Sequence, residues 1–303
     1  MRSGRGARRA ARPAGGIPAA PPANAAPVHD EPGALRAQLD RVEQAVLTSL
    51  RQPHPLTLPR GVVGAAYRRS RQTLHIGGDF YDVLRHGEYD SMVVLGDVSG
   101  RGVDAAVLTG QVRQALYALR LVERHPRELL RLLNGALLRT GEHQFATLVL
   151  GVCTPTATGG LSLTLAGGGH PCPVVLRTDG TVEDVPIGGM PVGAVADAEF
   201  ADVRVELGPG DVCVLYSDGV VEARGGVTGR EPLGHARLVR HLAASAGMPA
   251  DALAERVAQL ATDWLGGRDH DDIAVLAIQA PDVPRAGGRR HLHAVHDTAR
   301  PAA

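Results

Sequence analysis

Four short acidic segments, each beside glycine, are the part of this 303-residue chain best suited to chemistry. Their central residues are Asp79, Asp97, Asp218 and Asp271. Carboxylate oxygens are preferred ligands of Mg²⁺ and Mn²⁺, and small neighbours leave room for backbone carbonyls and waters. Each Asp-Gly pair is also an ordinary turn signal. Spacing alone therefore leaves a metal site and a set of turns both open.

Other catalytic motifs fit the chain less well. Ser99 is not in a G-x-S-x-G elbow, because its glycine lies three positions earlier. The glycines at 167–169 lead into His-Pro rather than into a helix, which argues against a dinucleotide loop. His270 precedes a β-rich run and has no recognisable partner ligands. The histidines expected to be surface or structural residues are His75, His86 and His143.

Short runs rich in Val and Leu are expected to position the aspartates as strands. These runs lie at 91–96, 146–153, 161–166, 173–176, 212–216 and 273–278. Helices are expected at 103–122, 126–139, 232–246 and 249–265. Strands come in consecutive groups separated by helix pairs, without strict alternation. This order favours an α+β fold with mostly antiparallel sheet.

The two ends of the chain differ from its middle. Residues 1–33, rich in Arg, Ala and Pro, and residues 281–303 are expected to be disordered tails. An amphipathic helix and linker are expected at 34–58, and a single domain at 59–280. The apolar stripe of that helix could pair with a second copy as a homodimer, bind an activator, or pack on its own domain. All three readings remain open.

Composition narrows the class of protein. Apolar residues make up 44% of the chain and aromatic residues 3%, so the core must be built from Val, Leu and Ala. Basic and acidic residues balance at 32 each, and no stretch approaches the roughly 18 apolar residues of a membrane span. We expect no nucleic-acid partner and no membrane span. The three cysteines, Cys153, Cys172 and Cys213, form no CxxC pair, which favours a reducing, cytoplasmic location.

Seven motifs follow one another in a specific order. They are GGDFYD at 77–82, GDVSGRG at 96–102, FATL at 145–148, GHP at 169–171, GGMPVG at 188–193, YSDGVVE at 216–222 and DDIAVL at 271–276. Together they resemble the SpoIIE/RsbU branch of the protein phosphatase 2C-like (PPM) superfamily, over about residues 40 to 280. One such motif would be weak, whereas seven in register are specific.

The resemblance implies a fold and a metal centre. The fold is an αββα sandwich of two mostly antiparallel sheets flanked by helices, and the centre holds two Mn²⁺ or Mg²⁺ ions. By position, the resemblance implies that Asp97 bridges the ions and that Asp97, Asp218 and Asp271 carry catalysis. The implied metal ligands are Asp79, Asp97, the Val98 carbonyl, Asp218 and Asp271.

Several positions are less well defined by the resemblance. Asp82 and Asp272 are expected to lie behind the metal ligands. Gly167-Gly168 stands where the family usually has Asn-Ala, a change at a structural turn. The phosphate-binding arginine of the wider superfamily has no clear counterpart. The nearby candidates without a clean match are Arg68, Arg69 and Arg71.

The function implied by the resemblance is that of a protein-serine/threonine phosphatase, in which a metal-activated water attacks phosphorus directly. The usual substrate in this branch is a phosphorylated anti-sigma-factor antagonist in a partner-switching cascade. One alternative is a phosphoprotein-binding module with little turnover, although none of the four aspartates is missing. Another is a hydrolase of small phosphoesters, which the sequence leaves open because substrate choice depends on loops.

Overall fold

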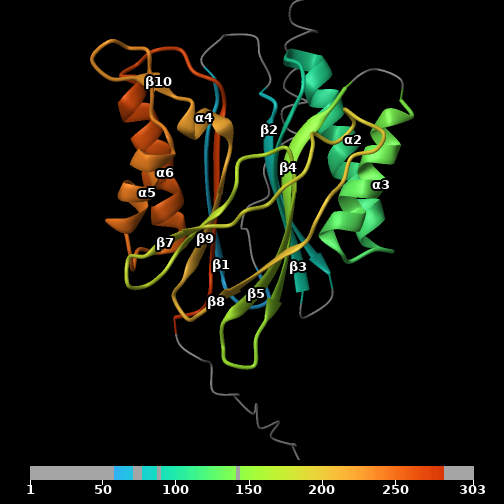
Figure 1. The fold of residues 1–303 in the computed structure, drawn as a ribbon, viewed down its shortest axis with the longest axis horizontal. Coiled ribbons are helices and arrows are strands. Elements are labelled where there is room, and N and C mark those ends of the chain that lie inside the picture. The colour runs from blue at the N-terminus through green and yellow to red at the C-terminus, as the bar shows by residue number, and fades with distance from the viewer. Residues whose placement is uncertain (1–57, 71–76, 87–89, 141–143, 283–303) are drawn as a thin grey trace, which may run out of the picture. The chain divides into compact units, whose positions relative to one another are not determined.

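The computed structural model describes residues 58–70, 77–86, 90–140 and 144–282. The expected helix at 34–50, the tail at 1–33, nearly all of 281–303, His75 and His143 therefore lie outside the described residues, as does the His86 side chain. The described part contains two five-stranded antiparallel sheets with helices on their outer faces (Figure 1). No helix in these ranges has the length and apolar character needed to cross a membrane.

The first sheet is built around a strand that is buried along its whole length. Its strand order is β1-β12-β9-β6-β7. The strands are β1 (Val62–Arg68), β12 (Ile273–Gln279), β9 (Val212–Tyr216), β6 (Val174–Leu176) and β7 (Val182–Asp184). Strand β12, IAVLAIQ, lies between β1 and β9 and is apolar at almost every position, as expected for a strand covered on both faces.

The second sheet is a set of antiparallel strands in the order β2-β3-β4-β5-β8. The strands are β2 (Asp79–His86), β3 (Asp90–Val98), β4 (Ala146–Pro155), β5 (Leu161–Gly168) and β8 (Val203–Leu207). All six strands expected from the sequence are present across the two sheets.

Helix pairs cover the outer faces of both sheets. The helices α2 (Gly102–Arg120) and α3 (Pro126–Leu138) pack on the second sheet, and α5 (His235–Ala243) and α6 (Ala250–Leu265) on the first. The smaller elements are α4 (Asp218–Val221) and the hairpin of β10 (Arg224–Gly225) and β11 (Glu231–Pro232). Three apolar layers result, one under each helix pair and one between the sheets. The expected αββα sandwich is confirmed.

Strand periodicity decides which acidic side chains can meet. On β3, Leu95 packs between the two sheets, whereas Val94 packs under α2 and α3. Successive side chains alternate between faces, so Asp97 lies on the same face as Leu95. On β2, Tyr81 lies between the sheets and Phe80 under the helices. The same rule places Asp79 on the inner face.

Candidate active site

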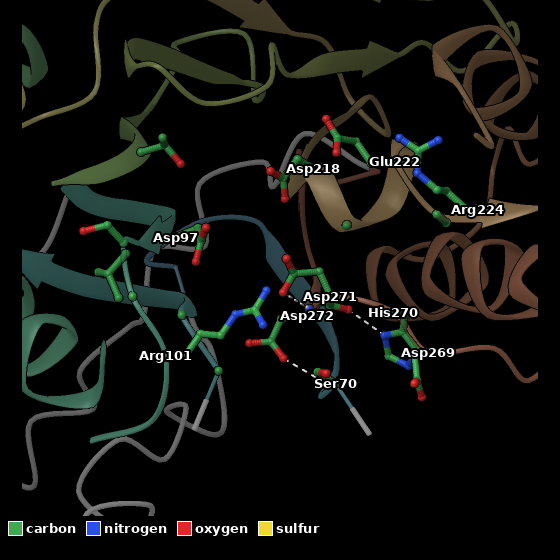
Figure 2. A pocket seen from close by; sticks show the side chains of 18 of the residues that line it. Ser70, Asp97, Arg101, Asp218, Glu222, Arg224, Asp269, His270, Asp271 and Asp272 are labelled. Atoms are coloured by element: carbon green, nitrogen blue, oxygen red, sulfur yellow. Dashed lines mark hydrogen bonds between the residues drawn. The ribbon is translucent and has the colours of Figure 1, made fainter. Parts of the chain in front are cut away.

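A cavity of about 460 Å³ opens at one end of the sandwich, where β3 and β9 end and β2 and β12 begin (Figure 2). Its wall is strongly acidic. The carboxylates that line it are Asp97, Asp218, Glu222, Asp269, Asp271 and Asp272. The structure thus brings together three of the four aspartates expected from the sequence, and the fourth, Asp79, lies buried behind the wall.

Asp79 and Asp97 are direct cross-strand partners of β2 and β3. Like charges opposite one another in a sheet are destabilising, so this pair is not explained by strand pairing alone. The close approach depends on Gly78, because a Cβ there would lie 2.2 Å from Asp97 Oδ1. Gly78 also accepts a hydrogen bond from the Val98 N–H, at 3.2 Å. The absence of a side chain at Gly78 therefore leaves room for the Asp97 carboxylate beside Asp79.

Three carboxylates at this end have pKa values raised above their ordinary range. Burial, followed by the charge of Asp97, raises the pKa of Asp79 well above its ordinary value. Burial, followed by Asp218 and Asp271, raises the pKa of Asp97 to about 7. Burial, Glu222 and Asp271 raise the pKa of Asp218. A bound cation would offset both causes, the burial of the carboxylates and their mutual repulsion, and so lower these pKa values.

The end of β9 is bonded to the start of β12, which places Asp218 in the cavity wall. Ser217 Oγ accepts a hydrogen bond from the Ala274 N–H at 3.0 Å, and the Ser217 N–H donates to the Ala274 carbonyl at 2.9 Å. Gly219 fits against the same strand, because a Cβ there would lie 1.9 Å from the Asp272 carbonyl oxygen. Asp218 and Asp271, far apart in sequence, therefore approach the cavity together.

Asp271 and Asp272 differ in what holds them. Asp272 is 3% exposed, and it accepts hydrogen bonds from the Tyr67 hydroxyl at 3.0 Å and the Ser70 N–H at 2.8 Å. Asp271 is exposed, and its Oδ1 accepts the Asp272 N–H at 2.9 Å. Asp272 thus ties β1 to the loop before β12, and Asp271 faces the cavity. Asp272 also lines the cavity, so its expected place behind the metal ligands stays a prediction.

Asp82 does not belong to the cavity. It lies three positions after Asp79, on the opposite face of β2, and is 1% exposed. Its carboxylate accepts hydrogen bonds from Arg113 Nη2 at 2.8 Å and the Tyr117 hydroxyl at 3.0 Å. Both partners are on α2. The expectation that Asp82 lies behind the metal ligands is wrong, because strand alternation turns it toward the helix layer.

The Gly-His-Pro motif supports the cavity wall. His170 is buried, and its Nδ1 lies 3.0 Å from the hydroxyl oxygen of Thr147, which lines the cavity. Burial lowers the pKa of His170 to about 3, so the ring is neutral at physiological pH. The loop after β3 is fixed in a similar way, since Ser99 Oγ accepts the Phe145 N–H at 3.0 Å. Both residues therefore hold segments of the cavity wall in place.

Two arginines that the sequence did not single out line the cavity: Arg101 and Arg224. The sequence candidates lie elsewhere. Arg68 pairs with Glu255 of α6, Arg69 is not part of the cavity wall, and Arg71 lies outside the described residues. A local signal was present for Arg101, which stands between two glycines directly before a helix.

The donor set suits a hard cation. In the described ranges, no three His, Cys, Asp or Glu side chains converge into a closed ligand group. The carboxylates instead face a shared cavity from separate segments, and Asp79 Oδ2 is buried without a hydrogen-bond partner in that part of the chain. Oxygen donors, excess negative charge and raised carboxyl pKa values together fit Mg²⁺ or Mn²⁺.

The sandwich has a protein phosphatase 2C-type fold. The SiaA-PP2C domain of Pseudomonas aeruginosa superposes with a TM-score of 0.63 at 20% identity, covering 82% of this chain and 96% of that one. The RsbU and RsbW domains of Rv1364c from Mycobacterium tuberculosis superpose with a TM-score of 0.62 at 25% identity, covering 77% and 62%.

The chain belongs to the SpoIIE family, because the model of Stage II sporulation protein E (SpoIIE) matches residues 88–281. Protein IcfG of Synechocystis is 26% identical over 277 residues, 81% of this chain and 42% of that protein. Phosphoserine phosphatase RsbU of Bacillus subtilis is 27% identical over 151 residues, 49% and 44% of the two chains. The chain thus spans less than half the length of these curated relatives. The resemblance read from the seven motifs is confirmed.

Proposed function

We propose that this chain is a metal-dependent protein-serine/threonine phosphatase. The observation that carries the proposal is the meeting of Asp97, Asp218 and Asp271, from three distant segments, around one cavity of a PP2C-type sandwich. The similarity of the chain to a relative named phosphoserine phosphatase RsbU supports the same activity. Family membership makes this reading preferable to a set of unrelated turns.

We propose two cation positions built from this chain's own oxygens. Asp97 would contribute to both positions, because it pairs with Asp79 across the sheet and its charge interacts with those of Asp218 and Asp271. Asp79 and the Val98 carbonyl would complete one position, and Asp218 with Asp271 the other. Bound Mn²⁺ or Mg²⁺ would supply an acidified water as the nucleophile and offset charge on the phosphoryl oxygens.

The surrounding residues hold the proposed ligands in place. Asp272, anchored by Tyr67 and Ser70, fixes the backbone beside Asp271. The Ser217–Ala274 hydrogen bonds fix the residue directly before Asp218, the first residue of α4. Substitutions at these supporting positions should alter geometry without removing a ligand, so we expect them to cost less activity than loss of an aspartate.

For the substrate, we propose a phosphorylated anti-sigma-factor antagonist of a partner-switching pathway in the cytoplasm. The similarity to RsbU, and to a mycobacterial chain that carries RsbU and RsbW domains together, supports this proposal. A homodimer formed through the 34–50 helix is a further proposal, resting only on the apolar stripe in that sequence. The proposed domain limits, 59–280, contain the whole described sandwich up to Ala280.

The test is phosphate release from a phosphoserine protein, measured with Mn²⁺ and with a chelator, for wild type and Asp97→Asn. We expect release to require the metal and to be lost in the variant. Asp197→Asn, an exposed aspartate outside the cavity, is the matched control and should keep wild-type activity. Release that survives Asp97→Asn would contradict the proposal. A folded but inactive wild type would favour the binding module, and a preference for small phosphoesters would favour the other alternative.

A further inference from the structure

The cavity is lined by two arginines, Arg101 and Arg224, that form no ion pair with any carboxylate of the described residues. Within the described ranges, most arginines that contact an acid do so on the surface or under a helix, as Arg113 and Arg177 do. A guanidinium that lines the cavity without an ion pair can bind an anionic ligand.

The backbone conformation around Arg101 depends on the two glycines that flank it. Gly100 and Gly102 both have positive φ, at 101° and 67°, and Arg101 between them is extended, at φ −146° and ψ 157°. Side chains other than glycine rarely adopt that positive-φ region. The turn therefore connects β3 to α2 sharply, and the exposed Arg101 side chain lines the cavity. Figure 2 shows the Arg101 guanidinium reaching toward Asp271 and Asp272 from the opposite wall.

We propose that Arg101 binds the phosphoryl group of the substrate, an inference that rests on the proposed phosphatase function. A phosphoryl dianion entering a cavity lined by carboxylates needs donors that offset the repulsion, and a planar guanidinium binds two phosphoryl oxygens at once. Arg101 is exposed, so its side chain can adjust to the substrate.

Arg224 is the weaker candidate for this contact. Its Nη1 donates to the Arg230 carbonyl at 3.4 Å, which holds it beside the β10–β11 hairpin at the edge of the cavity. Arg68 is engaged by Glu255, and Arg69 does not line the cavity. Arg101 is therefore the better placed of these arginines to contact a phosphoryl group in the cavity.

The experiment uses the full chain with Mn²⁺ and a phosphoserine peptide, and measures kcat, KM and the inhibition constant of inorganic phosphate. Arg101→Ala should raise both KM and the phosphate inhibition constant by about 10–100-fold, with a smaller change in kcat. Arg101→Lys should recover part of the loss, because it keeps the charge but not the fork. Arg69→Ala is the matched control and should behave as wild type.

Unchanged phosphate inhibition in Arg101→Ala, or a larger rise in Arg224→Ala or Arg69→Ala, would overturn the inference while leaving the phosphatase proposal standing. Wild type without metal-dependent turnover would overturn the phosphatase proposal itself, and the inference with it. Thermal unfolding checks that each variant is folded. Should Arg101→Ala fail to fold, Arg101→Gln provides the same loss of charge with a shorter polar side chain.

Discussion

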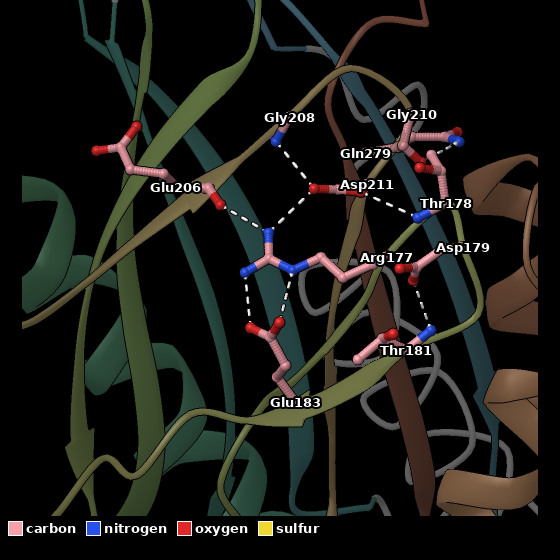
Figure 3. Close-up of polar contacts among 10 residues, drawn as sticks. All are labelled: Arg177, Thr178, Asp179, Thr181, Glu183, Glu206, Gly208, Gly210, Asp211 and Gln279. Atoms are coloured by element: carbon pink, nitrogen blue, oxygen red, sulfur yellow. Dashed lines mark hydrogen bonds and ion pairs between the residues drawn. The ribbon is translucent and has the colours of Figure 1, made fainter.

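The two ends of strand β9 each carry an aspartate, and the two aspartates have opposite surroundings. Asp211, just before the strand, accepts hydrogen bonds from Arg177 Nη1 at 3.0 Å, the Thr178 N–H at 3.1 Å and the Gly208 N–H at 2.9 Å (Figure 3). Asp218, just after the strand, faces other carboxylates across the cavity, and its pKa is raised. One end of the strand therefore carries a carboxylate with a cationic partner and hydrogen-bond donors, and the other end carries a carboxylate surrounded by like charges.

The cluster around Arg177 shows what a purely structural use of charge looks like. Arg177 makes a two-pronged contact with Glu183, at 2.7 Å and 3.2 Å, and its Nη1 also donates to the Glu206 carbonyl at 2.8 Å. The hydrogen bonds from Arg177 lower the pKa of Glu183. Every charge there has an opposite charge or a donor, whereas the cavity gathers like charges. Functional sites commonly give up stability in this way.

The largest difference between the two ends should be in activity. Asp218→Asn should lower metal-dependent phosphate release by about 10³-fold, because it removes a proposed metal ligand that stabilises charge in the transition state. Asp211→Asn, at the other end of β9, should stay within about threefold of wild type, because it touches no proposed ligand. Steady-state kinetics on both variants measures the contrast, and similar losses in the two would break it.

Stability should show the reverse order. Arg177→Ala should lower the free energy of unfolding by about 1–3 kcal/mol, because it leaves the largely buried Asp211 without its charged partner. Arg204→Ala, which removes an exposed pair with Glu206, is the matched control and should change it by less than about 1 kcal/mol. Urea unfolding of the metal-free protein gives both values. Equal losses in the two variants would show that the Arg177 cluster is no more than surface charge.

The pH dependence of stability should separate the ends further. In the folded, metal-free protein the pKa of Asp97 is raised to about 7, so the folded state holds a proton there that the unfolded state has lost. Stability from this group is therefore lost as pH rises from about 4 to 7. Asp97→Asn removes that loss, so its stability relative to wild type should rise across the same range. Urea titrations of both proteins at several pH values test the trend, and a constant or falling difference would contradict it.

The smallest effect is expected at Asp272, which shares features of both ends. It lines the cavity, yet Tyr67 and Ser70 bind it as Arg177 and its neighbours bind Asp211. Tyr67→Phe removes one hydrogen bond and should cost about 1 kcal/mol of stability, with a severalfold loss of activity. A loss as large as that of Asp218→Asn would show that Asp272 is a primary ligand rather than a support.

The sequence was sufficient for the parts of the fold whose signal is local. Apolar runs such as 212–216 and 273–278 gave strands β9 and β12 at almost their true bounds. By contrast β1 contains Gly64, Ala65 and Ala66, which do not favour strands by themselves. It is a strand because it pairs along its length with β12 and packs so closely on α6 that a Cβ on Gly64 would lie 2.2 Å from Ala250.

Side-chain direction was the harder part of the site. The acidic motifs located the cavity, but Asp82 turned to the helix layer because three positions along a strand reverse the face. The position of Arg101 at the cavity was not predicted, because it depends on two positive-φ glycines rather than on the residue type of Arg101 itself. The face of Asp82 can be read from a sequence only once the strand has been placed, whereas the two glycines beside Arg101 are a local signal of its turn.

The most direct test of the account is the thermal unfolding of wild type and Asp97→Asn, each with and without Mn²⁺. The measurement needs no substrate. If the acidic end of the sandwich is a cation site, Mn²⁺ should raise the Tm of wild type and leave that of Asp97→Asn nearly unchanged. Without metal, the variant should unfold at the same temperature as wild type or higher, because it relieves like-charge repulsion. An equal Mn²⁺ shift in both proteins would contradict the account, as would a metal-free variant less stable than wild type.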